Sequence, residues 1–208
     1  MVFLIQYKPG DKGCPGGGID GEFQRYGWNS NDFSDARFPQ PGTLLDFLAR
    51  HKALDTDFFY FGSEFICSEK LLNIIRLFRY GRMDTIEVRV HLQGHKSSTT
   101  PKKYFLLCSR EIRSLLDKKN AVYEIRKDPT THLPEQDNYH DGRDIYDSIT
   151  RFVVEKKDID LDFFICSEML MNEYVFSSRL KQAIESENLK GMSFIDIEES
   201  IYDAKLEF

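Results

Sequence analysis

The chain has 208 residues, of which 41% are hydrophobic and 30% charged, so it can bury a core and is too apolar to be disordered. Its formal net charge is −6 and it has no basic block, which argues against nucleic-acid binding. It has no secretory signal, no apolar window of about 18 residues and no CxxC pair among four cysteines. We therefore expect a protein of a reducing cytoplasm with free thiols and no membrane contact.

The first quarter of the chain predicts a strand, a long loop and a short helix. Residues 1–7 are mostly apolar and indicate an opening strand. Residues 8–42 form a long irregular segment rich in Gly and Pro. Thr43 is a plausible N-cap, so residues 43–54 are expected to form a short helix. Residues 55–67 are rich in aromatic side chains and indicate strands.

The middle of the chain predicts a helix followed by two paired strands. Apolar residues recur with helical spacing over 69–80, between Ser68 as N-cap and Gly81 as C-cap. Residues 83–94 alternate between apolar and polar side chains, which is typical of a half-buried strand. Residues 103–108 are its expected antiparallel partner.

The second half of the chain continues the mixture of strands and short helices. The pattern predicts a helix at 109–120, a strand at 121–126, a polar loop at 127–144, strands at 145–155 and 160–166, and a strand, helix, glycine turn and strand over 173–197. No linker divides these elements. We expect a single α+β domain over residues 1–208, with a mixed, largely antiparallel sheet and loosely duplicated halves.

A repeated Cys-Ser phrase occurs at 65–75, 105–116 and 163–173. A serine between an apolar strand and a helical pattern is a strong N-cap, so Ser68, Ser109 and Ser177 are expected to begin helices. The segment "YVFSSRLKQAI" at 174–184 overlays "FICSEKLLNII" at 65–75 and places Phe176 on Cys67. The position before the capping serine therefore requires an apolar residue rather than a thiolate. We expect Cys67 and Cys108 to be buried and inert, Ser177 to be the counterpart of Ser68, and the literal repeat "ICSE" at 165–168 to be partly coincidental.

An alternative hypothesis is a cysteine-dependent hydrolase or transferase. A cysteine at a helix N-terminus can have a lowered pKa, and the five histidines provide possible bases. Such an enzyme needs one exposed cysteine within hydrogen-bond reach of a histidine. Cys14, in the Gly-rich segment, is the only cysteine outside a strand-end slot.

No other motif forms a catalytic, cofactor or metal site. The "HLQGH" segment at 91–95 lacks the glutamate of a zincin and lies at a strand end rather than on a helix. The Gly-rich stretch at 10–21 lacks the Gly-Lys-Ser/Thr of a phosphate loop. The acidic segment at 132–144 lacks EF-hand spacing and is expected to be a solvated loop or a partner site. Trp28, the single tryptophan, could anchor its loop or a partner.

The second half has a serine-capped helix, a Leu-x-Gly turn and a last strand, formed by Ser177, Leu180, Ala183, Leu189, Gly191 and Phe194. This arrangement resembles the closing signature of the immunity proteins of bacterial polymorphic-toxin and interbacterial-competition systems, such as type VI secretion. Residues 44–71 are similar to the family's "Leu-x-Asp-Phe-Leu … Ser-Glu-x-Leu" opening, and 103–108 to its central aromatic strand. The resemblance covers 43–197.

The resemblance implies a bacterial cytoplasmic protein that binds a cognate toxin domain and blocks its activity, with no catalytic residues. An acidic inhibitor would suit a basic nuclease toxin. The hypothesis predicts an acidic or aromatic surface patch, with 135–147 and 10–42 as candidate regions. The candidate partner-binding residues are Trp28, Glu135, Asp137, Tyr139, Asp141 and Asp144. A non-catalytic oligomeric adaptor is a further alternative.

Overall fold

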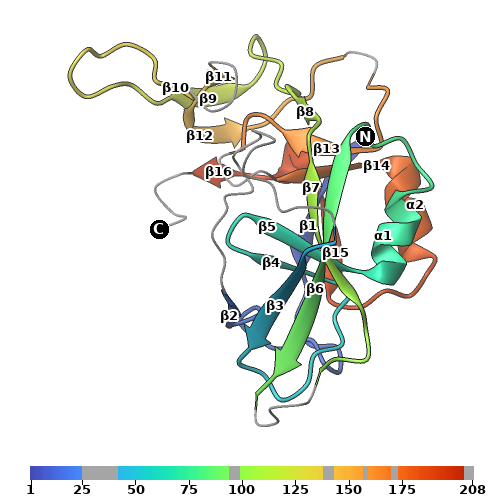
Figure 1. The fold of residues 1–208 in the computed structure, drawn as a ribbon. Coiled ribbons are helices and arrows are strands. Elements are labelled where there is room, and N and C mark those ends of the chain that lie inside the picture. The colour runs from blue at the N-terminus through green and yellow to red at the C-terminus, as the bar shows by residue number, and fades with distance from the viewer. Residues whose placement is uncertain (25–41, 94–98, 138–142, 157–158, 170–172, 204–208) are drawn as a thin grey trace.

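The computed structural model describes residues 1–24, 42–93, 99–137, 143–156, 159–169 and 173–203. Within these residues, strands greatly outnumber helices, since sixteen strands accompany two short α-helices and one 3₁₀ turn. The expected α+β class is therefore confirmed in its coarse form, with sheet dominating. Figure 1 shows the two helices side by side at one margin of the sheets.

A six-stranded sheet contains most of the first half of the chain. Its strands lie in the order β2-β3-β6-β7-β5-β4. Their bounds are β2 Gly21–Gln24, β3 Leu44–Ala49, β4 Phe58–Phe61, β5 Glu64–Ser68, β6 Met83–Leu92 and β7 Tyr104–Ser109. All neighbours are antiparallel except β3 and β6, which run parallel. The sheet curls until its two edge strands meet, because the rings of Phe23 and Phe61 lie 5.5 Å apart.

A five-stranded sheet contains the N-terminal strand and most of the last third of the chain, in the order β15-β1-β14-β13-β8. Its strands are β1 Val2–Tyr7, β8 Ile112–Arg113, β13 Phe163–Cys166, β14 Tyr174–Ser177 and β15 Met192–Asp196. A three-stranded sheet, β16-β12-β9, and a two-stranded hairpin, β10-β11, complete the fold. These comprise β9 Val122–Ile125, β10 Gln136–Asp137, β11 Arg143–Asp144, β12 Tyr146–Arg151 and β16 Tyr202–Asp203.

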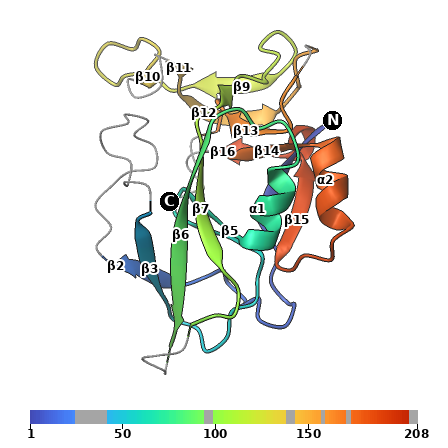
Figure 2. The same ribbon diagram turned by 45° about the vertical axis from the view of Figure 1, so that its right-hand side comes forward.

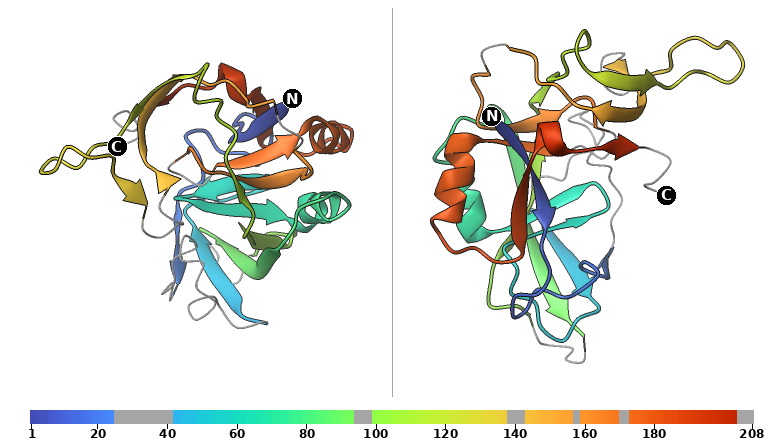
Figure 3. Two further views of the ribbon diagram at one scale, coloured as in Figure 1. Left: turned by 90° about the horizontal axis from the view of Figure 1, so that it is seen from above. Right: turned by 180° about the vertical axis from the view of Figure 1, so that it is seen from behind.

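Three apolar cores hold these layers together. The central core lies between the two large sheets and is aromatic, with Phe65 packed against Phe163, Tyr174 and Phe176 at centroid distances of 5.9, 4.7 and 6.3 Å. A second core fills the curl of the six-stranded sheet around Phe47. A third lies between the five-stranded and three-stranded sheets. Figures 2 and 3 show the sheets from further directions, with the helices at one end of both sheets.

The two large sheets contain the same four-stranded unit. In the first unit the strand order is β4-β5-β7-β6, and in the second it is β13-β14-β1-β15. Equivalent residues of β5 and β14, of the two helices and of β6 and β15 differ by 109 in number, as for Ser68 and Ser177 or Met83 and Met192. Those of β4 and β13 differ by 105, as for Phe58 and Phe163. Each unit carries one helix, α1 Glu69–Ile75 or α2 Ser178–Glu185. The expected loose duplication is therefore a structural repeat.

The second unit is circularly permuted relative to the first. Its fourth strand is β1 at the N-terminus, which takes the position that β7 holds in the first unit. The registers agree, because Tyr104 lies opposite Ser68 and Val2 lies opposite Ser177. The motif "FLI" of β1 thus replaces "FLL" of β7.

A buried aspartate precedes each unit and binds the turn after the other unit's helix. Asp57 N–H donates to Lys190 O at 2.8 Å, and Lys190 N–H donates to the Asp57 carboxylate at 2.9 Å. Asp162 N–H donates to Arg79 O at 2.7 Å, and Arg79 N–H donates to the Asp162 carboxylate at 3.2 Å. We call these two reciprocal contacts the aspartate latches. They fasten the two units to each other at both ends of the helix pair.

The capping predictions are confirmed for Ser68 and Ser177. Each serine is the last residue of a strand, and each hydroxyl accepts from the third residue beyond, at 3.2 Å. The first helix ends at Ile75, so the prediction that it extends to a C-cap at Gly81 is wrong. Gly81 instead lies in the turn before β6 with a φ of +61°, a conformation that suits glycine.

The prediction that Ser109 begins a helix is wrong. Ser109 ends β7 and is buried, and its hydroxyl accepts from Glu111 N–H at 3.2 Å. The chain stays extended into β8, which pairs in parallel with β13. Leu115 N–H then donates to the buried Glu168 carboxylate at 3.1 Å. Tertiary pairing thus overrides the local helical pattern.

The helix expected at 43–54 is also absent, and strand β3 takes its place. Leu45, Phe47 and Ala49 are buried while the residues between them are more exposed, which is the period of a strand. Thr43 therefore caps no helix. The strand lies between β2 and β6. The Gly-rich segment at 8–42 also contains β2, which its composition does not predict, and residues 25–41 lie outside the described residues.

The literal repeat at 165–168 does not start a helix in the described residues. Cys166 ends β13, and Ser167 and Glu168 lie in a turn. The equivalence of Ser68 with Ser177 is the one that the strand registers support. The strands expected at 1–7, 83–94, 121–126, 145–155 and 160–166 are present with shorter bounds, and the pairing of 83–94 with 103–108 is confirmed.

We predict that Asp162→Asn lowers the free energy of unfolding by about 2 kcal/mol at pH 7, because a carboxylate held by charged and neutral donors is replaced by an amide. Burial alone raises the pKa of Asp162, but hydrogen bonds from Ser177, Arg79 and Arg179 outweigh it and hold the pKa below its usual range. The carboxylate thus stabilises the fold above the unfolded-state value of about 3.9. This contribution is lost as the pH falls through the lower folded-state pKa.

Urea denaturation at a series of pH values measures this effect. The difference between the wild-type chain and Asp162→Asn should shrink as the pH falls from 7 towards 2. Asp20→Asn is the matched control, because the Asp20 side chain is 64% exposed and its carboxylate lies 3.6 Å from the Arg50 guanidinium. This substitution should lower the free energy of unfolding by less than about 0.5 kcal/mol. An equal decrease in the free energy of unfolding for both variants would show that the latch carboxylate stabilises the fold no more than an exposed carboxylate does.

Candidate partner-binding surface

The sequence-predicted partner residues fall around one hairpin. Asp137 lies in β10 opposite Arg143, and Asp144 lies in β11 opposite Gln136. Glu135 precedes β10 and is half-buried, with its N–H donating to Arg126 O at 2.8 Å. The other three predicted residues, Trp28, Tyr139 and Asp141, lie outside the described residues. The structure therefore brings together only the part of this set that flanks the hairpin.

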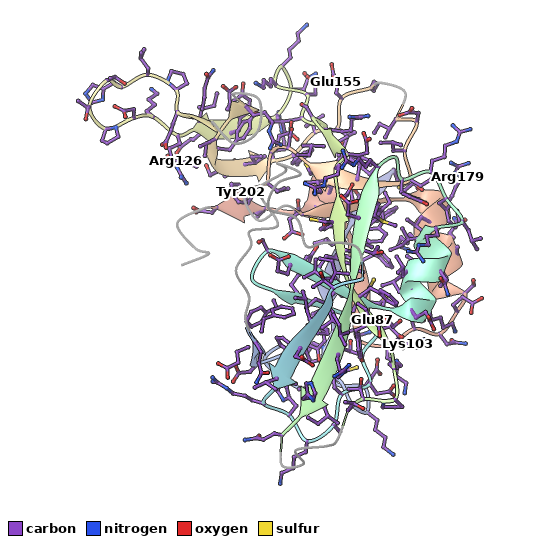
Figure 4. All side chains as sticks on the ribbon, viewed as in Figure 1. Glu87, Lys103, Arg126, Glu155, Arg179 and Tyr202 are labelled. Carbon is purple, nitrogen blue, oxygen red and sulfur yellow. The ribbon has the colours of Figure 1, made fainter. Side chains whose placement is uncertain are left out.

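The acidic charge at this hairpin is partly neutralised by neighbours. The Asp144 carboxylate lies 2.7 Å from Lys118 Nζ, and this contact raises the pKa of Lys118. Arg126 Nε donates to Asp147 at 2.9 Å. Figure 4 labels Arg126 where the chain leaves the sheet. Asp144 is therefore an internal ion-pair partner rather than an unpaired anionic contact.

Residues 126–135, which we call the arm, project from the body between β9 and β10. In Figure 1 they form the loop that extends farthest from the sheets. The arm is closed at its base, where Lys127 bridges to Pro134 and Arg126 N–H donates to Ile145 O at 2.7 Å. All residues from 129 to 134 are exposed, and Leu133, next to the bridge at the base, is 64% exposed.

Hydrogen bonds within the arm hold its shape. Asp128 Oδ1 accepts from Thr130 N–H at 2.9 Å, from Thr131 N–H and from the Thr131 hydroxyl at 3.0 Å. Asp128 N–H donates to Leu133 O at 3.0 Å, and His132 N–H donates to Asp128 O at 2.9 Å. The Thr131 N–H, Thr130 N–H and Thr131 hydroxyl bonds together lower the pKa of Asp128. His132 has a φ of +57°, an uncommon value for a non-glycine residue that this network maintains.

A polar hollow of about 500 Å³ lies beside the first latch. Lys102 Nζ lies 3.0 Å from both the Asp55 and the Asp57 carboxylates, and Lys190 Nζ also contacts Asp55. The contact with Lys190, followed by those of Lys102, lowers the pKa of Asp55. The charges that line the hollow are thus engaged with one another, and they join the loops of the two units.

An arginine-rich surface, which the sequence analysis did not single out, follows α1. Arg76, Arg79 and Arg82 are exposed around Leu77, which is 82% exposed. Arg179 adds a fourth guanidinium that binds the Asp162 carboxylate at 2.8 Å. Figure 4 labels Arg179 at α2. The segment "RLFRYGR" at 76–82 indicates this surface in the sequence, since it has three arginines in seven residues.

All four cysteines are buried and none is in a disulfide. Burial raises the pKa of the Cys108 thiol to about 12 and that of Cys67 higher still. Burial and the neighbouring Glu168 carboxylate raise the pKa of Cys166 well above its usual value. Neutral thiols are poor nucleophiles, so the burial and inertness expected for Cys67 and Cys108 fit their surroundings.

Cys14, the candidate of the enzyme hypothesis, is 5% exposed. Burial raises its pKa, a hydrogen bond with Thr56 opposes that rise, and Asp11 adds to it. The described histidines nearest to the sheets have other partners, since His51 accepts from Asp20 N–H at 2.9 Å and His91 lies 2.6 Å from Asp46. His95 and His140 lie outside the described residues. The surroundings of Cys14 therefore favour a structural role.

In the described part of the chain, no group of three or more His, Cys, Asp or Glu side chains is placed to hold a metal ion. Among the same residues, no helix has the length and apolar character needed to cross a membrane.

The family model described as immunity protein 43 matches residues 21–206. The match contains every described element from β2 to β16 and leaves β1 outside. A comparison with curated proteins finds no match. The family match confirms the resemblance to immunity proteins that the serine-capped helix and its following turn indicated.

We predict that no cysteine of the folded chain reacts with iodoacetamide over the time in which a model thiol is consumed, because all four are buried with raised pKa values. Denaturation should make all four reactive. Intact mass spectrometry, with peptide mapping, counts the modified sites in both states. Rapid labelling of Cys14 alone in the folded chain would contradict the structural role of Cys14 and support the enzyme hypothesis.

Proposed function

The chain belongs to the immunity protein 43 family, and on this premise we propose that it binds a cognate bacterial toxin domain and blocks that domain's activity. The observation that carries the proposal is the extent of the match, which covers residues 21–206 and so includes both helices and both latches. The match thus extends over every described element except β1 rather than over a short motif.

Binding rather than chemistry is the mode of action that the geometry favours. The four thiols are buried with raised pKa values, so none is poised as a nucleophile. The exposed features of the described residues are instead contact surfaces, and the arm holds its shape without a partner. A preformed surface binds with a smaller loss of conformational entropy than a flexible one.

The net charge and the thiols suggest the setting in which the protein acts. A formal charge of −6 would steer association with a basic toxin, for which a nuclease is the leading candidate. Four thiols without disulfides suit the reducing bacterial cytoplasm, where an immunity protein would meet an incoming toxin. Delivery of that toxin by a contact-dependent route such as type VI secretion belongs to the same proposal.

We predict that the purified chain inhibits the toxin domain encoded beside its gene stoichiometrically. Titration of the toxin activity with the chain should give a straight decline that ends at a fixed molar ratio, because each bound molecule removes one toxin from action. Size-exclusion chromatography with light scattering should then show a complex of that ratio. Co-expression should restore growth to cells that produce the toxin.

Two controls test whether the inhibition is specific and stoichiometric. A toxin domain from an unrelated pair should keep its activity, since neutralisation depends on specific contacts. Loss of the cognate activity at far below one chain per toxin, with a changed toxin mass, would indicate an enzyme instead. Absence of both a complex and protection would overturn the proposed function.

A further inference from the structure

The arm differs from the other exposed surfaces because its exposed residues are held in place by hydrogen bonds within the loop. These exposed residues, from 129 to 134, are two prolines, two threonines, His132 and Leu133. Residues 129–134 contain no Asp, Glu, Lys or Arg, and the carboxylate of Asp128 beside them accepts from three donors of Thr130 and Thr131. The exposed part of the arm is therefore nearly uncharged.

This chemistry selects the kind of surface that the arm can enter. An uncharged loop lacks the Lys and Arg side chains on which recognition of a phosphate backbone depends. It can bury apolar area in a concave pocket, where energetically dominant contacts cluster. Figure 3 shows the arm standing clear of the rest of the chain in the view from above, so a partner can close around it.

We propose that the arm is the anchor of the complex, and that Leu133 enters a concave, uncharged cleft of the cognate toxin domain. The inference rests on the proposed function and names the contact that it uses. Asp128 is a positioning residue, which holds the loop in the shape that binds. The net charge of the chain steers the encounter, and the arm determines how long the complex lasts.

The arginine-rich surface provides a matched control. Leu77 is the more exposed of the two leucines, at 82% against 64% for Leu133, but it lies among Arg76, Arg79 and Arg82 rather than on a projecting loop. The two leucines thus separate general surface apolarity from the specific role of the arm. Replacement of either by aspartate should leave the fold intact, since both side chains are largely exposed.

The experiment measures binding of the full-length chain and three variants to the purified toxin domain by surface plasmon resonance. We expect Leu133→Asp to weaken binding at least about 30-fold, mainly through faster dissociation, as for a central contact residue. We expect Leu77→Asp to change it less than about 3-fold. Asp128→Ala should slow association about 10-fold, because fewer molecules hold the binding conformation. Melting temperatures should be unchanged for both leucine variants.

The outcomes separate the two proposals. Wild-type affinity for Leu133→Asp, or equal losses for Leu133→Asp and Leu77→Asp, would overturn the anchor role and leave the proposed function standing. Failure of the wild-type chain to bind the toxin domain would overturn the proposed function and the anchor role together. A loss confined to the arm variants, with neutralisation reduced in parallel, is the result expected from the proposal.

Discussion

The arrangement of the whole molecule depends on the two aspartate latches. Each couples the start of one unit to the end of the other unit's helix through a backbone pair and a buried carboxylate, so neither unit can shift without breaking both. A buried carboxylate that loses its donors is costly, which makes the relative position of the units well defined. The central aromatic core then packs between two surfaces whose spacing is already set.

The parts of the fold that sequence could predict are those where local pattern and tertiary role agree. The alternation of 83–94 and the serine caps at Ser68 and Ser177 are signals of this kind. At 43–54 an apolar spacing compatible with a helix belongs to β3, because the strand completes a curled sheet whose partners are distant in sequence. After Ser109 the same conflict arises, and long-range pairing with β13 decides it.

The arm lies beside the region that the sequence indicated for a partner and differs from it in chemistry. The sequence indicated 135–147 and 10–42, with acidic and aromatic side chains as contacts. The structure pairs Asp144 with Lys118 and turns Asp128 towards the donors of Thr130 and Thr131, so the exposed residues 129–134 carry no carboxylate. Asp followed by Pro-Thr-Thr is a typical self-bonding turn sequence, so the order of the arm was readable. The partners of the carboxylates were not, because Lys118 lies 26 residues from Asp144.

The permuted position of β1 has a consequence for how the chain reaches its native state. The ribosome makes this strand long before its two neighbours, β14 and β15. The strands of the first unit are contiguous in the chain, so this unit can close during synthesis, while the second must wait until β15 has been made. The order of synthesis therefore separates the closure of the two units, and a chain that stops short of β14 leaves β1 as an exposed edge.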